Sequence, residues 1–161
     1  MSGRPFRNTG VIPRFRSAGR GMVQAYREEP NLRFHVFAGT CAAVTAYAVG
    51  LTGWEVAYLG GTIALVLFAE LVNTAVERAV DLAVGRERHP LAGAAKEVAS
   101  GAVLLTALHA VFAAVLLFAL RRDLVESVQA VLRLLLQRPF WIAPPAIAGL
   151  LGLFGGDRQP S

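Results

Sequence analysis

The sequence predicts an all-α membrane protein with an amphipathic N-terminal surface helix, three transmembrane helices and an extra C-terminal amphipathic and apolar helical extension. Two observations predict this fold class. Of the 161 residues, 55% are hydrophobic and only 17% are charged, which is too apolar for an ordinary soluble domain. The apolar residues also form long segments, and a helix of roughly 20 such residues spans the hydrocarbon core of a bilayer.

The N-terminal part is expected to lie outside the bilayer core. Residues 1–13 are rich in Gly, Pro, Ser and Arg and are predicted to be disordered. Residues 14–29 place apolar side chains at helical spacing, with arginines between them; these are Phe15, Ala18, Met22, Ala25 and Tyr26. This pattern predicts an amphipathic helix on the membrane surface, which Pro30 limits.

Three apolar segments follow and complete a domain predicted over residues 14–120. The first spanning helix is expected at residues 32–51, and the second from Trp54 to about Val84. The polar loop of residues 85–90 leads to a third helix that is amphipathic at first and fully apolar over residues 101–120. Basic residues are concentrated before the first segment and around the polar loop. The N-terminus and this loop are therefore expected in the cytoplasm, as in a multi-pass protein of the bacterial inner membrane.

The remaining residues, 121–161, form the extension, whose role the sequence leaves open. Residues 124–136 have the pattern of an amphipathic helix, with five leucines and three valines. Residues 140–156 are apolar but contain Pro144 and Pro145, so a fourth span, a re-entrant segment and an interfacial helix all remain possible.

The overall charge excludes few partners, although it disfavours nucleic acid. The net charge is +5, and 15 of the 16 basic residues are arginine. These arginines flank apolar segments instead of forming a continuous basic stripe, which is typical of a topology signal and not of nucleic-acid binding. The single cysteine, Cys41, excludes an internal disulfide.

Four polar residues interrupt the second apolar segment and form an acidic stripe: Glu70, Asn73, Glu77 and Asp81. At about 100° per residue their offsets place all four within roughly 80° of one another around the helix. A charged group at the centre of a spanning helix costs about 2.5–3.5 kcal/mol on insertion scales, so such residues usually have a function. Carboxylate and amide oxygens suit Mg²⁺ better than Zn²⁺.

Two further clusters are expected at the same cytoplasmic interface. One contains Lys96, Glu97 and Ser100, and the other contains Glu28 and Glu29 at the end of the surface helix. Carboxylates with one lysine suit Mg²⁺-assisted phosphoryl transfer, and a deep glutamate can take a proton from a lipid hydroxyl. The chain has no P-loop, dinucleotide-binding or protein-kinase motif. Pairing of Glu77 or Asp81 with Arg78 or Lys96 purely for structure is an alternative.

The segments at 69–81 (AELVNTAVERAVD) and 89–105 (HPLAGAAKEVASGAVLL), together with REEPNLRFH at 27–35, closely resemble the small bacterial integral-membrane diacylglycerol and undecaprenol kinases. The resemblance covers residues 14–120. It implies three transmembrane helices plus a surface helix, a homotrimer with sites between subunits, and transfer of the γ-phosphate of Mg-ATP to the primary hydroxyl of a membrane lipid.

The resemblance also implies roles for individual residues. Glu70 matches the catalytic base and Asn73 the amide beside it, while Glu29 and Glu77 match the Mg²⁺-binding pair. Lys96 matches the lysine that contacts phosphate. Four more residues match positions near the sugar and base of ATP; these are Asp81, Glu87, His89 and Glu97.

Three departures from the family pattern stand out. Glu97 occupies a position where aspartate is more usual, the arginine that contacts nucleotide has only Arg14 and Arg16 as candidates, and residues 122–161 have no match. The REEPNLRFH segment favours the undecaprenol branch over the diacylglycerol branch. A non-enzymatic membrane assembly factor and a small ion or proton pathway are the alternatives, and neither requires ATP.

Overall fold

The computed structural model describes residues 10–85, 89–120 and 124–137, and this part of the chain is entirely helical. Its elements, in chain order, are α1 (Val11–Glu28), α2 (Pro30–Ala48), α3 (Trp54–Val84), α4 (Pro90–Ala114), the π-helix η1 (Val115–Leu120) and α5 (Leu124–Gln137). The expected surface helix begins at Val11, three residues earlier than predicted, and Glu87 lies outside the described residues.

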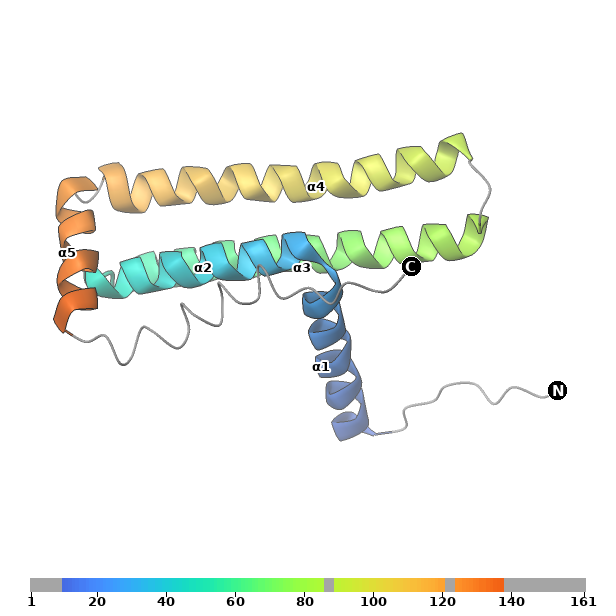
Figure 1. Cartoon of the computed structure of the whole chain (residues 1–161), viewed down its shortest axis with the longest axis horizontal. Coiled ribbons are helices and arrows are strands. Elements are labelled where there is room, and N and C mark those ends of the chain that lie inside the picture. The colour runs from blue at the N-terminus through green and yellow to red at the C-terminus, as the bar shows by residue number, and fades with distance from the viewer. Residues whose placement is uncertain (1–9, 86–88, 121–123, 138–161) are drawn as a thin grey trace.

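The long helices α3 and α4 form an antiparallel hairpin, and α2 lies along the first part of α3 (Figure 1). Two glycines with positive φ, Gly50 (69°) and Gly53 (58°), make the tight connection from α2 to α3. Gly85, also at positive φ (59°), ends α3. Because α2 begins opposite the middle of α3, the second half of the hairpin extends beyond α2 toward Gly85.

Two helices in the described part of the chain are long and apolar enough to cross a membrane, Trp54–Val84 and Pro90–Leu120. They coincide with the second and third predicted spans. The 19-residue α2 does not reach the same hydropathy, because Asn31, Arg33 and His35 occupy its first two turns.

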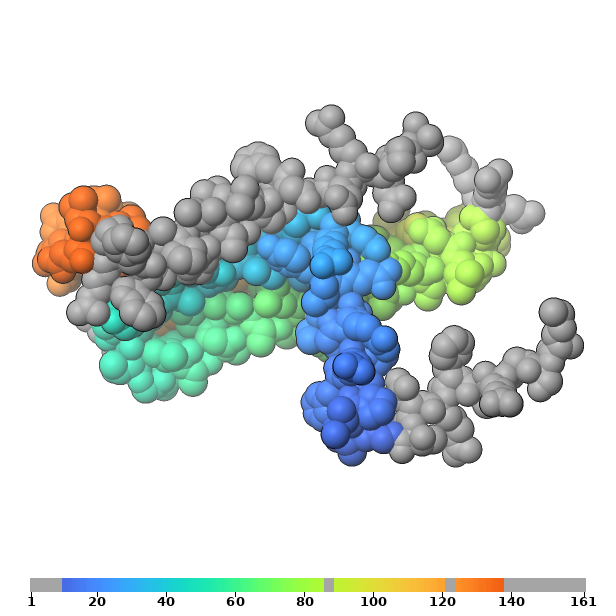
Figure 2. All heavy atoms as spheres, turned by 60° about the horizontal axis from the view of Figure 1, so that its bottom comes forward, coloured from blue at the N-terminus to red at the C-terminus, as the bar shows by residue number. Residues whose placement is uncertain are grey.

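Helix α1 projects sideways from the bundle, as both overall views show (Figures 1 and 2). Ala25 is its buried residue and faces the bundle. Val11, Ile12, Phe15, Met22 and Val23 remain exposed. At about 100° per residue these five lie within one stripe of roughly 120°, with Arg16, Arg20 and Arg27 beside it. Such a helix suits the surface of a membrane.

The apolar core lies at the end of the bundle away from α1. Ala46, Leu51 and Leu59 pack there against Leu117 and Phe118. The last two belong to η1, where the sequence predicts a regular helix. In a π-helix the backbone hydrogen bonds join residues i and i+5, one residue farther apart than in an α-helix. Leu117 of this segment is fully buried.

Helix α5 confirms the amphipathic helix predicted for residues 124–136. It crosses the end of the bundle and contacts α2 and η1 (Figure 1). Its buried residue, Ser127, donates a hydrogen bond to the Phe118 carbonyl oxygen over 3.2 Å. The apolar segment predicted at 140–156 lies outside the described residues, as does most of the predicted disordered start.

Candidate active site

The acidic stripe lies on the second half of α3, as the sequence predicts. A 31-residue helix is about 46 Å long, and the hydrocarbon core is about 30 Å thick, so α3 is about 16 Å longer than the core. The stripe from Glu70 to Asp81 has the same rise, about 16 Å. If α3 enters the core at Trp54, Glu70 lies near the opposite boundary, and Glu77 and Asp81 lie beyond it.

The deepest member of the stripe, Glu70, faces α2. Glu70 is only 3% exposed, and its Oε1 lies 3.1 Å from Nε2 of His35. Two further carboxylates, Glu29 and Glu77, are close enough to act electrostatically on Glu70. His35 is thus the direct hydrogen-bonding partner of the proposed base, a contact that the sequence alone does not indicate.

The next two members of the stripe contact each other. Asn73 Nδ2 donates to Glu77 Oε1 over 2.9 Å. Asn73 Oδ1 is buried and has no hydrogen-bond partner. Leaving a buried amide oxygen without a hydrogen bond costs about 1–3 kcal/mol. A bound ligand or ion would give the Asn73 oxygen a partner.

This donor set fits a magnesium ion of the type held jointly by protein and substrate. Among the described residues, no three His, Cys, Asp or Glu side chains form a complete metal cage. Mg²⁺ rarely uses such a cage, because it usually binds through one or two carboxylates together with substrate phosphates and water. Glu29 and Glu77, with the Asn73 oxygen between α1 and α3, provide oxygen ligands of the right kind.

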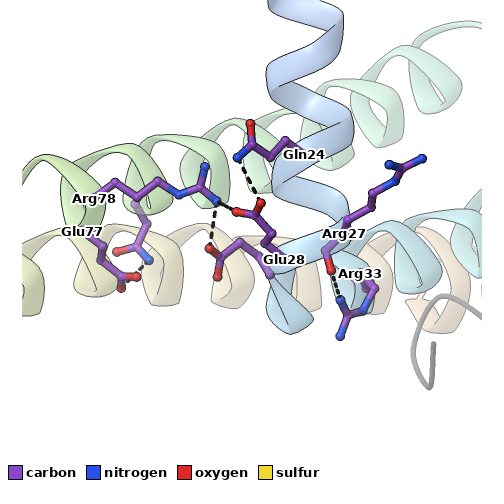
Figure 3. A network of polar contacts seen from close by, with 8 residues as sticks. Gln24, Arg27, Glu28, Arg33, Glu77 and Arg78 are labelled. Atoms are coloured by element: carbon purple, nitrogen blue, oxygen red, sulfur yellow. Dashed lines mark hydrogen bonds and ion pairs between the residues drawn. The ribbon is translucent and has the colours of Figure 1, made fainter. Parts of the chain in front are cut away.

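Arg78 ties the end of α1 to α3. Its guanidinium donates to Glu28 Oε2 over 2.7 Å and to Glu29 Oε1 over 3.3 Å, and Gln24 donates to Glu28 from one turn earlier (Figure 3). Glu28 itself remains exposed, with half of its side chain open to solvent in this pair. Arg78 therefore holds Glu29 beside the stripe.

The link between α1 and α2 is fixed by a buried arginine. Arg33 is 7% exposed, and its guanidinium donates to the Arg27 carbonyl oxygen over 2.7 Å (Figure 3). This bond satisfies a carbonyl in the last turn of α1, where helical carbonyls lack partners. It sets the angle at which Glu29 reaches the site.

The outermost member, Asp81, faces α4. Lys96 donates to Asp81 Oδ1 over 2.6 Å. The structural pairing considered for Asp81 is thus present, whereas Glu77 pairs with Asn73 instead of Arg78. Both partners of the Asp81–Lys96 pair are partly exposed, so the pair contributes little to stability, and Lys96 remains accessible to phosphate.

The remaining candidates at the start of α4 lie apart from the acidic stripe. Glu97 is exposed, and its side chain makes no contact with the stripe within the part of the chain that the structure describes. His89 is the N-cap of α4, where its Nδ1 accepts a hydrogen bond from the Leu91 backbone over 3.2 Å. Its geometry is that of a helix cap, and a nucleotide contact stays a prediction.

An apolar cavity of about 320 Å³ lies between α2, α3 and α4. His35 and Phe34 line one part of it, and Ile63, Val66 and Ala110 line others. Its walls also include Thr62, whose hydroxyl lies 3.4 Å from His109 Nε2. This contact joins α3 and α4 through polar side chains, as is common between helices in membranes.

The site therefore unites side chains from four helices. The structure brings Glu29, Glu70, Asn73 and Glu77 together, and it places Asp81 with Lys96 farther along the hairpin. Sequence reasoning missed His35 and Arg78 as members. Arg78 directly follows Glu77 in the sequence, which could have marked it as a member. The contact of His35 with Glu70 joins two different helices and leaves no signal in the spacing.

Comparisons with known proteins agree with this arrangement. The model of a family described as prokaryotic diacylglycerol kinase matches residues 16–118, a range that contains every candidate site residue except Arg14. A diacylglycerol kinase from Synechocystis sp. is 44% identical over 101 residues, which are 63% of this chain and 58% of the relative. The chain thus spans less than two thirds of that relative. No solved structure matches the chain.

Two other relatives are similar over most of their own length. An undecaprenol kinase from Bacillus subtilis is 38% identical over 108 residues, which are 65% of this chain and 84% of the relative. A diacylglycerol kinase from Haemophilus influenzae is 33% identical over 85 residues, which are 53% of this chain and 71% of the relative.

Proposed function

Because this chain belongs to the prokaryotic diacylglycerol kinase family, we propose that it transfers the γ-phosphate of Mg-ATP to the primary hydroxyl of a membrane lipid, either undecaprenol or diacylglycerol. The observation that carries this proposal is Glu70. It is a buried carboxylate, 3% exposed, close to an apolar cavity and to two further carboxylates. A lipid needs an apolar cavity for its chain, and a phosphate bound through a metal ion needs carboxylates nearby. The two have to adjoin at the group that takes the hydroxyl proton.

The proposed arrangement follows the depth of each residue along α3. The lipid keeps its hydrocarbon between the helices and presents its hydroxyl to Glu70, and the apolar cavity of about 320 Å³ supports such a path. ATP lies at the cytoplasmic boundary, near Lys96, Asp81, Glu87, His89 and Glu97. When bound by Glu29 and Glu77, Mg²⁺ would neutralise charge on the phosphates.

In the chemical step, a Glu70 carboxylate oxygen accepts the proton of the lipid hydroxyl. The freed lipid oxygen forms a bond to the γ-phosphorus as the bond from that phosphorus to its bridging oxygen breaks, and ADP leaves. Lys96 donates hydrogen bonds to phosphate oxygens, and Asn73 keeps Glu77 in place through the 2.9 Å contact. Burial of Glu70, which is 3% exposed, keeps water away from the proton acceptor.

We also propose that the chain has three membrane spans, with α2 as the first, and that its N-terminus and the 85–89 connection face the cytoplasm. The polar start of α2 supports this orientation, because Arg33 and His35 then lie at the cytoplasmic boundary with the acidic stripe. A homotrimer in the bacterial inner membrane is proposed on the resemblance described above.

The test is transfer of radiolabelled γ-phosphate from ATP in detergent micelles with magnesium, with diacylglycerol and undecaprenol offered side by side. Label in either lipid supports the kinase, and the ratio identifies the acceptor. Absence of label in both lipids, from folded protein, would favour the assembly-factor or ion-pathway alternatives.

The first variant to assay is Glu70→Gln. We expect transfer to fall at least 100-fold because general base catalysis contributes 10²–10⁴-fold. Glu55→Gln is the matched control, since Glu55 is 6% exposed at the other end of α3 and far from the stripe. Activity near wild type in Glu70→Gln would refute the assignment of Glu70 as the base.

A further inference from the structure

We propose that His35 is a positioning residue, which holds one oxygen of Glu70 so that the other oxygen faces the lipid hydroxyl. This inference rests on the proposed function, because it concerns how the proposed base is oriented. It adds a residue from α2 to a site otherwise built on α1, α3 and α4.

The contact itself is the first support. His35 Nε2 lies 3.1 Å from Glu70 Oε1, which is within hydrogen-bonding distance. Only 4% of the Glu70 side chain and 16% of the His35 side chain are exposed. A carboxylate so buried needs a donor, since an unpaired buried charge costs several kcal/mol.

The negative charges around Glu70 increase its need for the hydrogen bond from His35. Glu29 and Glu77 act on Glu70 with the same sign of charge. Their repulsion would displace a flexible Glu70 side chain. A hydrogen bond from His35 fixes the carboxylate in one orientation against this repulsion and leaves its second oxygen available as the proton acceptor.

The imidazole is itself held in place. Phe34 and His35 rings meet edge to face, with centroids 5.5 Å apart. Both side chains also line the apolar cavity between α2, α3 and α4. His35 therefore lies where the cavity meets Glu70, which is where a hydroxyl on an apolar chain would arrive.

The proposed role does not require His35 to exchange protons with substrate. With Nε2–H donating to Glu70, the imidazole acts as an orienting group in the same way that a second partner orients a catalytic histidine or carboxylate. Misplacement of a reacting group by about 1 Å can cost 10²-fold in rate. Loss of the donor should therefore reduce kcat and leave the binding of ATP and lipid nearly unchanged.

The test compares three variants in the radiolabel assay, with the full chain in micelles. His35→Leu removes the donor, and we expect kcat to fall 10- to 100-fold while both KM values stay within about threefold of wild type. His35→Gln places an amide N–H near the Nε2 position and should recover at least a third of kcat. His109→Leu is the matched control, since His109 hydrogen-bonds Thr62 elsewhere in the bundle, and it should retain kcat.

Three outcomes would overturn the proposal. Wild-type kcat in His35→Leu would show that Glu70 needs no orienting donor. Equal losses in His35→Leu and His35→Gln would show that the hydrogen bond is not what matters. A loss confined to thermal stability, with kcat unchanged in the folded fraction, would assign His35 a structural role only.

A second readout is independent of catalysis and of the folding of the His35 variants. In protein labelled with ¹⁵N-histidine, Glu70→Gln should shift the Nε2 resonance of His35 but not that of His109. Unshifted His35 resonances would refute the contact. If the contact is seen and wild-type protein transfers no phosphate to either lipid, the proposed function fails while the hydrogen bond stands.

Discussion

Glu70 shows how a single residue can be inferred from the cost of its location. A carboxylate in an apolar helix is expensive, so the sequence alone marks it as functional. The sequence could not show its partner, because His35 is 35 positions away and only the packing of α2 on α3 brings the two together. Helical spacing predicts which residues share a stripe, and it says nothing of what faces that stripe.

The magnesium assignment can be tested at Glu77. We expect Glu77→Gln to raise the magnesium concentration for half-maximal activity by at least tenfold, because an amide oxygen is a weaker ligand than a carboxylate oxygen. The measurement is a magnesium titration of the transfer rate at fixed ATP.

Glu28→Gln is the control for this titration, since Glu28 lies at the same interface but pairs with Arg78. Its half-maximal magnesium concentration should change much less. Equal shifts in the two variants would indicate a general effect of surface charge and would contradict a specific role for Glu77.

At the scale of secondary structure elements, the positions of the helices were predictable and their junctions were not. Periodicity and hydropathy predicted α1, α3, α4 and α5 within a few residues. The π-helical end of α4 was not predicted, because nothing in Val115–Leu120 distinguishes it from an apolar α-helix. Its geometry depends on packing of Leu117 and Phe118 against α2 and α3.

At the junction of α3 and α4, we predict that replacing Lys96 lowers activity without lowering stability. The Lys96–Asp81 pair is partly exposed, and such pairs contribute about 0–1 kcal/mol. Lys96→Met should therefore change the unfolding temperature little, while raising the KM for ATP at least tenfold because a phosphate contact is lost. Thermal unfolding and ATP titration of the same preparation measure both. A large fall in stability with normal KM would make Lys96 structural.

The packing of α2 on α3 predicts a second effect. A Cβ atom added at Gly39 would lie 3.0 Å from Ile63 Cγ2, so Gly39→Ala forces Ile63 to move. We expect a loss of about 1–3 kcal/mol from overpacking. Gly60→Ala, on α3, meets no atom within 4 Å and should be neutral or stabilising. Chemical denaturation in micelles compares the two, and equal stabilities would contradict this close approach.

At the scale of the whole molecule, the chain divides into a part that carries the site and a part that does not. The family match ends at residue 118, and every candidate site residue precedes it. Truncation after Leu120 should thus preserve kcat and the proposed trimeric state, while lowering thermal stability through loss of α5 from the end of α2. Light scattering and the transfer assay measure these outcomes. Loss of kcat in a trimer that remains folded would assign the extension a catalytic role.

The short connection between α3 and α4 has a consequence for how the chain enters the membrane during synthesis. Of the three acidic residues in the second half of α3, only Glu70 lies within the length that spans the core, so its solvation is the one that opposes insertion. Helix α4 follows within a few residues and brings Lys96 to Asp81. Because these two charges pair at the end of the hairpin that lies outside the hydrocarbon core, neither has to cross it when the helices insert.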